Sequence, residues 1–242
     1  GGQNDGVSNA EELALRLSYL MVRRTRDEVD VEIPAVHHQI VTLPAVPEVT
    51  TLMHRGALPA ALAAAATHKI DAALAHAADL APCLVWTWRR ADAEAISAQL
   101  PSVFVHGGLS VEERDARVQE ACARGVSLVA TMDAAATGLN LQKIGSRMLF
   151  HSLDWVPVKM LQAIGRLRRL GQSANKIHVV FLVLEGSPDE LIRRTVIDKL
   201  DQWERIMAAG RLTPDDAAEL SSNLSAGDKE FMQRIYKEMS DG

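Results

Sequence analysis

The densest group of side chains that could do chemistry lies in residues 162–172, which read Gln-Ala-Ile-Gly-Arg-Leu-Arg-Arg-Leu-Gly-Gln. Helical spacing predicts that Gln162, Arg166 and Arg169 share one side of a helix, whereas Arg168 points elsewhere. A guanidinium group stays charged and donates hydrogen bonds as a planar fork, so arginines at these positions suit phosphate. The alternative is a basic helix face in water, which is the commoner role of an isolated Arg-Leu-Arg-Arg.

Polar residues also follow four apolar runs of strand length. Ligands of open parallel sheets bind in the loops beyond the carboxyl ends of the strands, so these loops are predicted to share one face. They are Thr87 to Arg90, His106 to Ser110, Thr131 to Leu141 and His151 to Pro157. Candidates to line a groove that follows a phosphate backbone are Thr87, Trp88, Arg89, His106, Gly107 and Lys159. Trp88 could instead cap the sheet, and a histidine in a Gly-Gly turn is commonly structural.

From residue 82 onward, predicted strands and helices alternate, and this pattern predicts the fold that positions these loops. The predicted strands are 83–87, 103–105, 127–130, 147–150 and 177–182. The predicted helices are 91–100, 110–124 with a capping box of Ser110 and Glu113, a short turn near 134, and 157–170. This pattern is typical of an open α/β domain with a parallel sheet covered by helices on both faces.

Helical segments are predicted to flank this domain. A helix is expected over 10–27, capped by Asn9 and ending in a basic stretch, followed by a half-exposed strand over 38–43 and an alanine-rich helix over 57–80. Beyond Ser187 a helix is expected to continue to about residue 207, with smaller polar helices over 214–220 and 228–239. We therefore divide the chain into a tail and linker helix (1–34), the α/β domain (35–200) and a helical extension (201–242).

The composition excludes several classes of protein. With 48% hydrophobic and 24% charged residues in 242, the chain has a globular profile, and its longest apolar stretch, near residues 60–66, is far shorter than the roughly 20 residues of a membrane span. The formal charge of −5 means that any contact with phosphate must come from a local patch. Cys83 and Cys122 are predicted to be reduced core thiols without metal ligand spacing. A start at Gly1 without methionine suggests a piece of a longer protein.

Several motifs in order resemble the C-terminal RecA-like lobe of the Swi/Snf family of superfamily-two helicase-like ATPases. The 162–172 tract matches that family's Gln-Ala-x-x-Arg-x-x-Arg-x-Gly-Gln helix, and residues 138–141 match its Gly-Leu-Asn-Leu loop. Weaker matches are Trp155-Val156-Pro157 to Trp-Asn-Pro, the 84–88 strand, the 108–114 segment and the Arg-Arg-Thr tract at 23–25. The chain departs from the family at Ala135 and Ala136, where two glycines are usual, which leaves the contacts of that loop open.

The resemblance implies roles for individual residues. Arg166 and Arg169 would be arginine fingers that reach ATP held by another lobe, where such a group stabilises charge on the transferred phosphoryl group. Gln162, Gly138 and Asn140 would lie on the nucleotide side of the site. Thr131 and the 138–140 loop would touch the nucleic-acid backbone, although Thr131 could be a simple strand-end hydroxyl.

The resemblance also implies cofactors and partners. ATP and Mg²⁺ would be held mainly by an N-terminal RecA-like lobe, because the sequence contains no Gly-x-x-x-x-Gly-Lys-Ser/Thr loop. This chain alone is therefore expected to be inactive as an ATPase. The expected partners are double-stranded DNA and that N-terminal lobe, in a cytoplasmic setting and without a membrane.

Two rival functions remain open from the sequence. One is an RNA-directed superfamily-two helicase lobe, which would share the fold and the arginine fingers. The other is a non-catalytic interaction module that kept the RecA-like fold, against which the intact Arg166 and Arg169 speak. No feature of the sequence indicates a particular protein partner.

Overall fold

The structure is a computed structural model, and it describes residues 34–135, 140–154, 157–169 and 171–194. These residues lie within one compact unit, Glu32–Ile197. Predictions for 1–33 and 195–242, and those for Gly138, Trp155 and Val156, lie outside the described residues, so the proposed division of the chain stays a prediction. Within the described part, no helix is long and apolar enough to cross a membrane.

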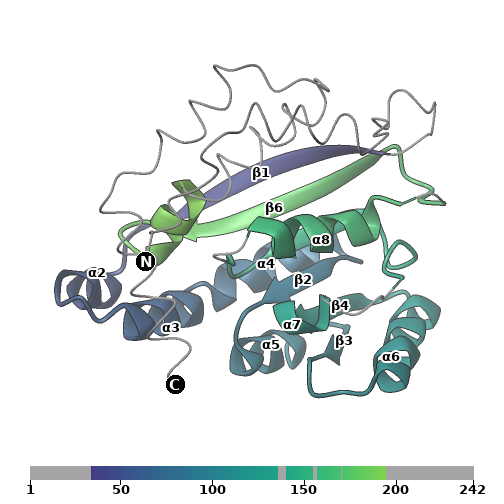
Figure 1. The fold of residues 1–242 in the computed structure, drawn as a ribbon, viewed down its shortest axis with the longest axis horizontal. Coiled ribbons are helices and arrows are strands. Elements are labelled where there is room, and N and C mark those ends of the chain that lie inside the picture. Colours follow the sequence, from purple (N-terminus) through teal and green to yellow (C-terminus); the bar gives the residue numbers. More distant parts are fainter. Residues whose placement is uncertain (1–33, 136–139, 155–156, 170, 195–242) are drawn as a thin grey trace, which may run out of the picture. The chain divides into compact units, whose positions relative to one another are not determined.

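A single sheet of six parallel strands forms the centre of the fold (Figure 1). The strands lie in the order β1-β6-β5-β2-β4-β3, and every pairing is parallel. Their bounds are β1 Ala35–Leu43, β2 Leu84–Thr87, β3 Ser102–Val105, β4 Ser127–Thr131, β5 Arg147–Phe150 and β6 Lys176–Leu184. The predicted α/β class is confirmed. Of the five strands predicted from residue 82 onward, β5 has the predicted bounds, and each end of the other four lies within two residues of its predicted place.

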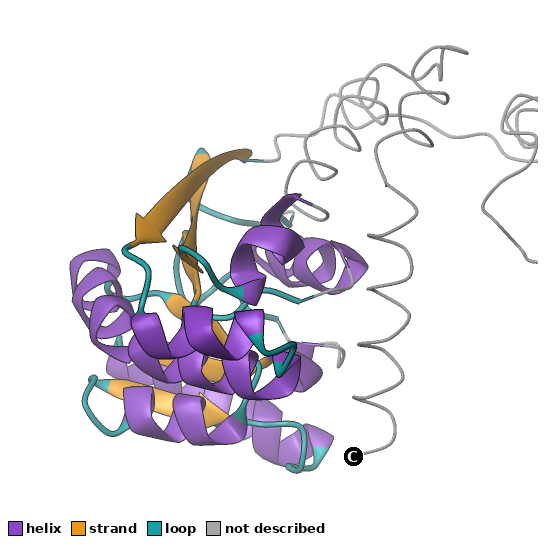
Figure 2. Cartoon of the chain, turned by 90° about the vertical axis from the view of Figure 1, so that its left-hand side faces the viewer, coloured by secondary structure: helices purple, strands orange, loops and turns teal. Residues whose placement is uncertain are grey.

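Both faces of the central strands are buried. Val85 and Leu149 point to one face, where they pack with α4 and α5 in a hydrophobic cluster. Their neighbours Leu84, Trp86 and Phe150 point to the opposite face and have no exposed surface either. Strands buried on both sides must be apolar throughout rather than alternating, which is why their sequences read as short continuous hydrophobic runs. Figure 2 shows the helices packed around the strands.

Seven labelled helices connect and cover the strands. They are α2 Pro47–His54, α3 Leu58–His68, α4 Ile70–Leu80, α5 Arg90–Ser97, α6 Val111–Arg124, α7 Met132–Ala135 and α8 Pro157–Leu167, and residues 188–194 are also helical. The predicted capping box is confirmed, because Ser110 accepts from the amide of Glu113 and the Glu113 side chain accepts from the amide of Ser110. Gly125 ends α6 with a φ of 62°, a conformation that favours glycine.

Several sequence-based bounds were wrong. The helix expected over 57–80 is two helices, because Lys69 has φ −88° and ψ −5° and separates α3 from α4. Helix α2 was not predicted, and β1 begins three residues earlier than expected. Helix α8 ends at Leu167 rather than 170, since the chain turns there and reaches Gly171 at a φ of 86°.

The two cysteines are free thiols, as predicted, but they differ in burial. Cys83 lies directly before β2 in the core, and burial raises the pKa of its thiol to about 11. Cys122 is only partly buried on α6, so it is not a core thiol. Burial also raises the pKa of Cys122.

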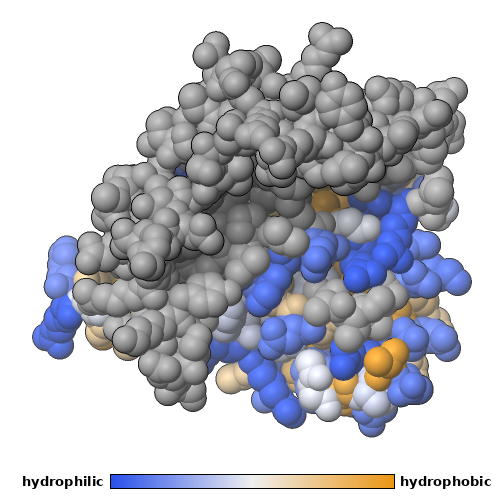
Figure 3. Space-filling model, viewed as in Figure 1, coloured by the Kyte–Doolittle hydropathy of each residue, from blue (hydrophilic) through white to orange (hydrophobic). Residues whose placement is uncertain are grey.

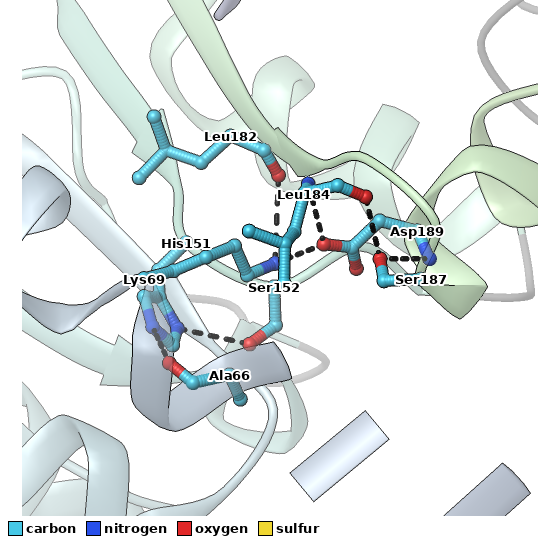
Figure 4. Close-up of polar contacts among 8 residues, drawn as sticks. All are labelled: Ala66, Lys69, His151, Ser152, Leu182, Leu184, Ser187 and Asp189. Carbon is cyan, nitrogen blue, oxygen red and sulfur yellow. Dashed lines mark hydrogen bonds and ion pairs between the residues drawn. The ribbon is translucent and has the colours of Figure 1, made fainter. Parts of the chain in front are cut away.

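A buried ion pair fixes the break between α3 and α4 (Figure 4). The Lys69 ammonium lies 2.7 Å from a carboxylate oxygen of Asp189 and donates to the carbonyl of Leu182 at 3.5 Å. The same Asp189 oxygen accepts from the amide of Leu184 at 3.1 Å. The two charged side chains expose only 2% and 4% of their surface. The pair therefore ties the helix break to the carboxyl end of β6 and to the helical residues 188–194.

The first prediction concerns this pair. Lys69→Met should lower the free energy of unfolding by about 3–5 kcal/mol, because it leaves the Asp189 carboxylate buried without its cation. Adding Asp189→Asn should recover part of the loss, since asparagine is neutral and still accepts from Leu184. Urea unfolding followed by circular dichroism measures both.

The exposed pair of Arg124 and Glu120 on α6 supplies the matched control. Arg124→Met should cost less than about 1 kcal/mol. Equal losses in the free energy of unfolding for Lys69→Met and Arg124→Met would show that the buried pair stabilises the fold no more than the exposed pair.

Candidate functional site

The candidate site lies at the edge of the sheet where the parallel strands end. The loop after β3 meets the segment after β4 there, because a Cβ atom added at Gly107 would lie 3.1 Å from the Cβ of Asp133 in α7. The residues after β2 and β5 follow neighbouring strands of the same sheet. The predicted gathering of these loops on one edge follows from the parallel topology.

Arg166 and Arg169 are both half-buried at the end of α8. Arg169 lies two residues beyond the helix, and its Nη1 donates to the side-chain oxygen of Asn140 at 3.0 Å. Burial lowers the pKa of Arg166, and the positive charge of Arg169 adds to this effect, so the two guanidinium groups lie close enough to repel each other. Among the described residues, neither of them forms an ion pair with a carboxylate.

Arg168 points away from this pair, as its helical position predicts. Its Nε donates to the carbonyl of Pro34 at 3.0 Å, at the start of β1. Gln162 is exposed on α8, one turn before Arg166. Figure 3 shows hydrophilic surface over α8. The tract therefore separates one arginine that contacts the β1 end of the sheet from two that remain free to bind an anion.

Gln172 joins the two segments that carry Asn140 and Arg169. Its side-chain amide nitrogen lies within hydrogen-bond distance of three carbonyls, those of Gln142 at 3.3 Å, Gly145 at 3.1 Å and Leu167 at 3.4 Å. The last glutamine of the tract thus has a positioning role that sequence reasoning did not assign to it. Gly138, two residues before Asn140, lies outside the described residues.

Trp88 and Lys159 come together at this edge. The Lys159 ammonium lies 5.3 Å from the centre of the Trp88 ring, which is a cation–π geometry, and Trp88 is 36% exposed. The same ammonium lies 3.4 Å from a carboxylate oxygen of the buried Asp154. Sequence reasoning missed Asp154, although its place in the loop after β5 was a usable signal.

Thr87 and Arg89 were predicted to line the groove, and in the structure both have hydrogen-bond partners within the protein. Thr87 has no exposed surface, and its hydroxyl donates to the carbonyl of Arg89 at 3.2 Å. Arg89 donates to the carbonyl of Ala63 in α3 at 2.7 Å and lies 3.6 Å from Asp92. Burial raises the pKa of the Asp92 carboxyl group, and the charge of Arg89 opposes that rise. Arg89 therefore holds the start of α5 against α3, and Thr87 supports the backbone of Arg89.

His106 has local partners as well, and Thr131 is buried. The Nδ1 atom of His106 accepts from the amide of Gly108 at 3.1 Å, and its ring lies 5.2 Å from that of Phe104. Partial burial lowers the pKa of His106, and nearby arginines add to the shift. Thr131 ends β4 and is only 5% exposed. The structural alternative therefore fits His106 in this structure, and Thr131 offers little surface.

His151, directly after β5, is a buried neutral histidine. Its Nε2 lies 2.9 Å from the carbonyl of Ala66, and its Nδ1 lies 3.0 Å from the hydroxyl of Ser152 (Figure 4). Burial, reinforced by the charge of Lys69, lowers the pKa of His151 to about 3. Sequence reasoning gave this residue no role of its own. In the described part of the chain, no three potential metal ligands come together.

Comparison with known proteins identifies the class first. Residues 67–171 match the family model described as the helicase conserved C-terminal domain. The six-stranded parallel sheet confirms the predicted fold class, and the match shows that residues 67–171 are similar to helicase C-terminal domains.

Among curated proteins, two that are similar to this chain indicate the type of helicase lobe that it resembles. The nuclear protein STH1/NPS1 of Saccharomyces cerevisiae is 34% identical over 86 residues, which cover 36% of this chain and 6% of that protein. The SWI/SNF-related matrix-associated actin-dependent regulator of chromatin subfamily A-like protein 1 of Xenopus tropicalis is 24% identical over 233 residues, which cover 83% of this chain and 24% of that protein. These matches agree with the resemblance drawn from the motifs, since both relatives are similar to this chain and one is named as SWI/SNF-related.

A solved structure is also similar. The C-terminal part of the Fun30 ATPase domain has 16% sequence identity and a TM-score of 0.45, over 66% of this chain and 48% of that chain. The matched part of the chain spans a quarter or less of the length of the two curated relatives described above. The yeast relative is named a nuclear protein, so the relatives do not support the cytoplasmic setting expected above.

The second prediction follows from His151. The unfolded chain binds a proton on this imidazole near its ordinary pKa of 6.5, whereas the folded protein binds it only near pH 3. Stability from this residue is therefore complete above pH 6.5 and falls as the pH drops toward 3. Between pH 7 and pH 5 the loss should be about 2 kcal/mol.

The variant His151→Gln keeps a donor for Ala66 and does not titrate. Its loss of stability between pH 7 and pH 5 should be about 2 kcal/mol smaller than that of the unmodified chain. Urea unfolding at the two pH values measures this difference. Identical pH dependence in both proteins would contradict a buried neutral His151.

Proposed function

We propose that this chain is the C-terminal lobe of an ATP-dependent DNA translocase and supplies two arginine fingers to ATP held by an N-terminal lobe. The observation that carries the proposal is the pair Arg166 and Arg169, half-buried at the end of α8 and without a described carboxylate partner. Two like charges held close together are relieved by an anion between them, and phosphate provides one.

Asn140 positions the second of these arginines. Its side-chain oxygen accepts from Arg169 Nη1 without neutralising the guanidinium charge, so Arg169 is held in place and remains a cation. ATP with Mg²⁺ supplies the phosphoryl group whose transfer the lobe assists. In that step Arg166 and Arg169 stabilise the charge that develops on the phosphoryl oxygens, which needs closure of the two lobes.

Lys159 and Trp88 are the best-placed groups for the nucleic-acid backbone. Lys159 is 42% exposed, and the Trp88 ring beneath it limits the directions in which the ammonium can point. A cation held in this way can contact one phosphate at a defined place. His106 and Gly107 follow β3 in the same group of loops, while Thr87 and Thr131 are buried at the ends of β2 and β4 and are given no direct contact with DNA. Double-stranded DNA is the proposed substrate, in keeping with the chromatin regulator among the relatives.

The chain alone should not hydrolyse ATP, because its sequence has no Gly-Lys-Ser or Gly-Lys-Thr to cradle the triphosphate. The two lobes would close over ATP and open after hydrolysis. This motion would shift the grip of Lys159 along one strand of the duplex. The proposed setting is inside the cell, with DNA.

The third prediction tests the arginine fingers. In a protein that joins this chain to its N-terminal lobe, Arg169→Ala should lower DNA-stimulated ATP hydrolysis by about 10³-fold or more. Arg168→Ala is the matched control, since Arg168 lies next in sequence but donates to Pro34. It should leave the rate within about threefold of the parent, because it lacks a transition-state contact.

Initial rates of phosphate release at saturating DNA measure both variants. Retained activity in Arg169→Ala would remove the finger role. An equal loss in Arg168→Ala would show that the tract only maintains the fold.

The fourth prediction tests the DNA contact. Binding of this chain to duplex DNA should be weak and should fall steeply with salt. Lys159→Gln, which keeps a donor for Asp154, should flatten the plot of log K against log salt by about 0.9, the value of one phosphate contact.

The control is Arg124→Gln at the carboxyl end of α6, which lies at the opposite edge of the sheet because the helices run antiparallel to the strands. Fluorescence anisotropy with a labelled duplex at several salt concentrations measures the slopes. Equal slopes for Lys159→Gln and the parent would contradict the contact.

A further inference from the structure

Strand β1 is an outer strand of the sheet with an unusual lack of cover. None of its nine residues is buried, whereas its neighbour β6 is buried at seven of nine positions. Figure 2 shows the long β1–β6 pair at the margin of the described residues. The other outer strand, β3, has only four residues, and Arg117 donates to the outer carbonyl of Phe104 at 2.9 Å. Only β3 is thus both short and covered by a side chain.

The free hydrogen-bonding groups of β1 can be assigned from its pairing with β6. The amide of Ala35 donates to Asn175 at 3.1 Å, and the carbonyl of Leu43 accepts from Glu185 at 2.9 Å, so both ends of the strand face β6. Successive residues of a strand alternate, so the peptide groups of every second residue point away from β6. These are Val36, His38, Ile40 and Thr42. No described residue pairs with them.

The sequence of β1 lacks the usual protection of an outer strand. Exposed edges are commonly blocked by charged side chains, proline or a bulge, because they otherwise attract another strand. Residues 35–43 contain no Asp, Glu, Lys, Arg or Pro, and prolines occur only outside the strand, at Pro34 and Pro44. The nine-residue pairing with β6 has no bulge. The edge is therefore straight, close to neutral and limited to these nine residues.

We propose that the outer edge of β1 pairs with β1 of a second copy of this chain, antiparallel and centred on Gln39. In this register Val36 lies opposite the partner's Thr42, and His38 lies opposite the partner's Ile40. All four outward residues then form pairs that exchange two hydrogen bonds each. The same register overlaps the full length between the two prolines. A shift by two residues loses one pair, so the strand specifies its own alignment.

The side chains and charges agree with this partner. Ile40 is 38% exposed, the second most exposed large hydrophobic residue described, and the pairing covers it with the partner's His38. Neither strand carries Asp, Glu, Lys or Arg, so the pairing brings no permanent like charges together. One pair of strands buries less than a standard interface, so the dissociation constant should be about 10⁻⁵ to 10⁻³ M. The contact lies on β1 and does not depend on the proposed ATPase role.

The first experiment measures mass. Sedimentation equilibrium of this chain at pH 7.5, from about 5 µM to 1 mM, should show a monomer that becomes a dimer. Ile40→Lys should weaken the dimer by at least about tenfold, because a lysine on the edge must lose water to pair. Val111→Lys is the control, since Val111 is 52% exposed on α6 and far from β1 in the sheet order. A monomer at every concentration overturns the proposal, as does equal weakening by both variants.

The second experiment tests the register. Gln39 would face its own copy in a non-hydrogen-bonded pair, in which Cα atoms lie about 4.5 Å apart, within the range that a disulfide spans. In a Cys122→Ser background, Gln39→Cys should form a disulfide-linked dimer at least about tenfold faster than Thr42→Cys, which would face the partner's Val36. Both positions are exposed on the same strand.

Equal rates for the two cysteine variants overturn the proposed register. Hydrogen exchange then identifies a different occupant of the edge. Amides of Val36, His38, Ile40 and Thr42 should become protected as the concentration of the chain rises. Protection that is complete at the lowest concentration would show that residues of the same chain cover the edge, and it would overturn the proposal.

Discussion

All six strands run parallel, and this constraint decides where chemistry can occur in the molecule. It places the ends of β2, β4 and β5 at one edge, so residues far apart in sequence become neighbours there. It also covers the central strands with helices on both faces, so the polar groups that follow these strands gather where the strands end. The arginine tract on α8 is a candidate site because of its place in this sheet, since the same residues on an isolated helix would be an ordinary basic surface.

Charged groups at this edge fall into two classes that differ in burial. Lys69 and Asp189 neutralise each other inside the protein, and the neutral His151 lies nearby, so these groups hold the fold together. Arg166 and Arg169 carry charge that no described carboxylate neutralises. A protein retains such uncompensated charge at a cost in stability, which is a common property of sites that bind an oppositely charged ligand.

Much of the fold was predictable because its signals are local. Apolar runs marked the strands, and the capping box at Ser110 marked the start of α6. The break at Lys69 was not predicted, because no glycine or proline marks it and Lys69 pairs with a carboxylate 120 positions away. Within the site, the opposite directions of Arg168 and Arg169 followed from helical spacing. The burial of Thr87 and the contact of Arg89 with α3 did not, since position at the end of a strand does not fix side-chain direction.

The three carbonyl contacts of Gln172 have a mechanical consequence. They link the segment that carries Asn140 to the end of the helix that carries Arg166, so the two cannot move independently. A displacement of the 140–145 loop would therefore also shift the end of α8 and the guanidinium of Arg169, which Asn140 holds. A single uncharged side chain, Gln172, thus couples the position of this loop to the end of α8.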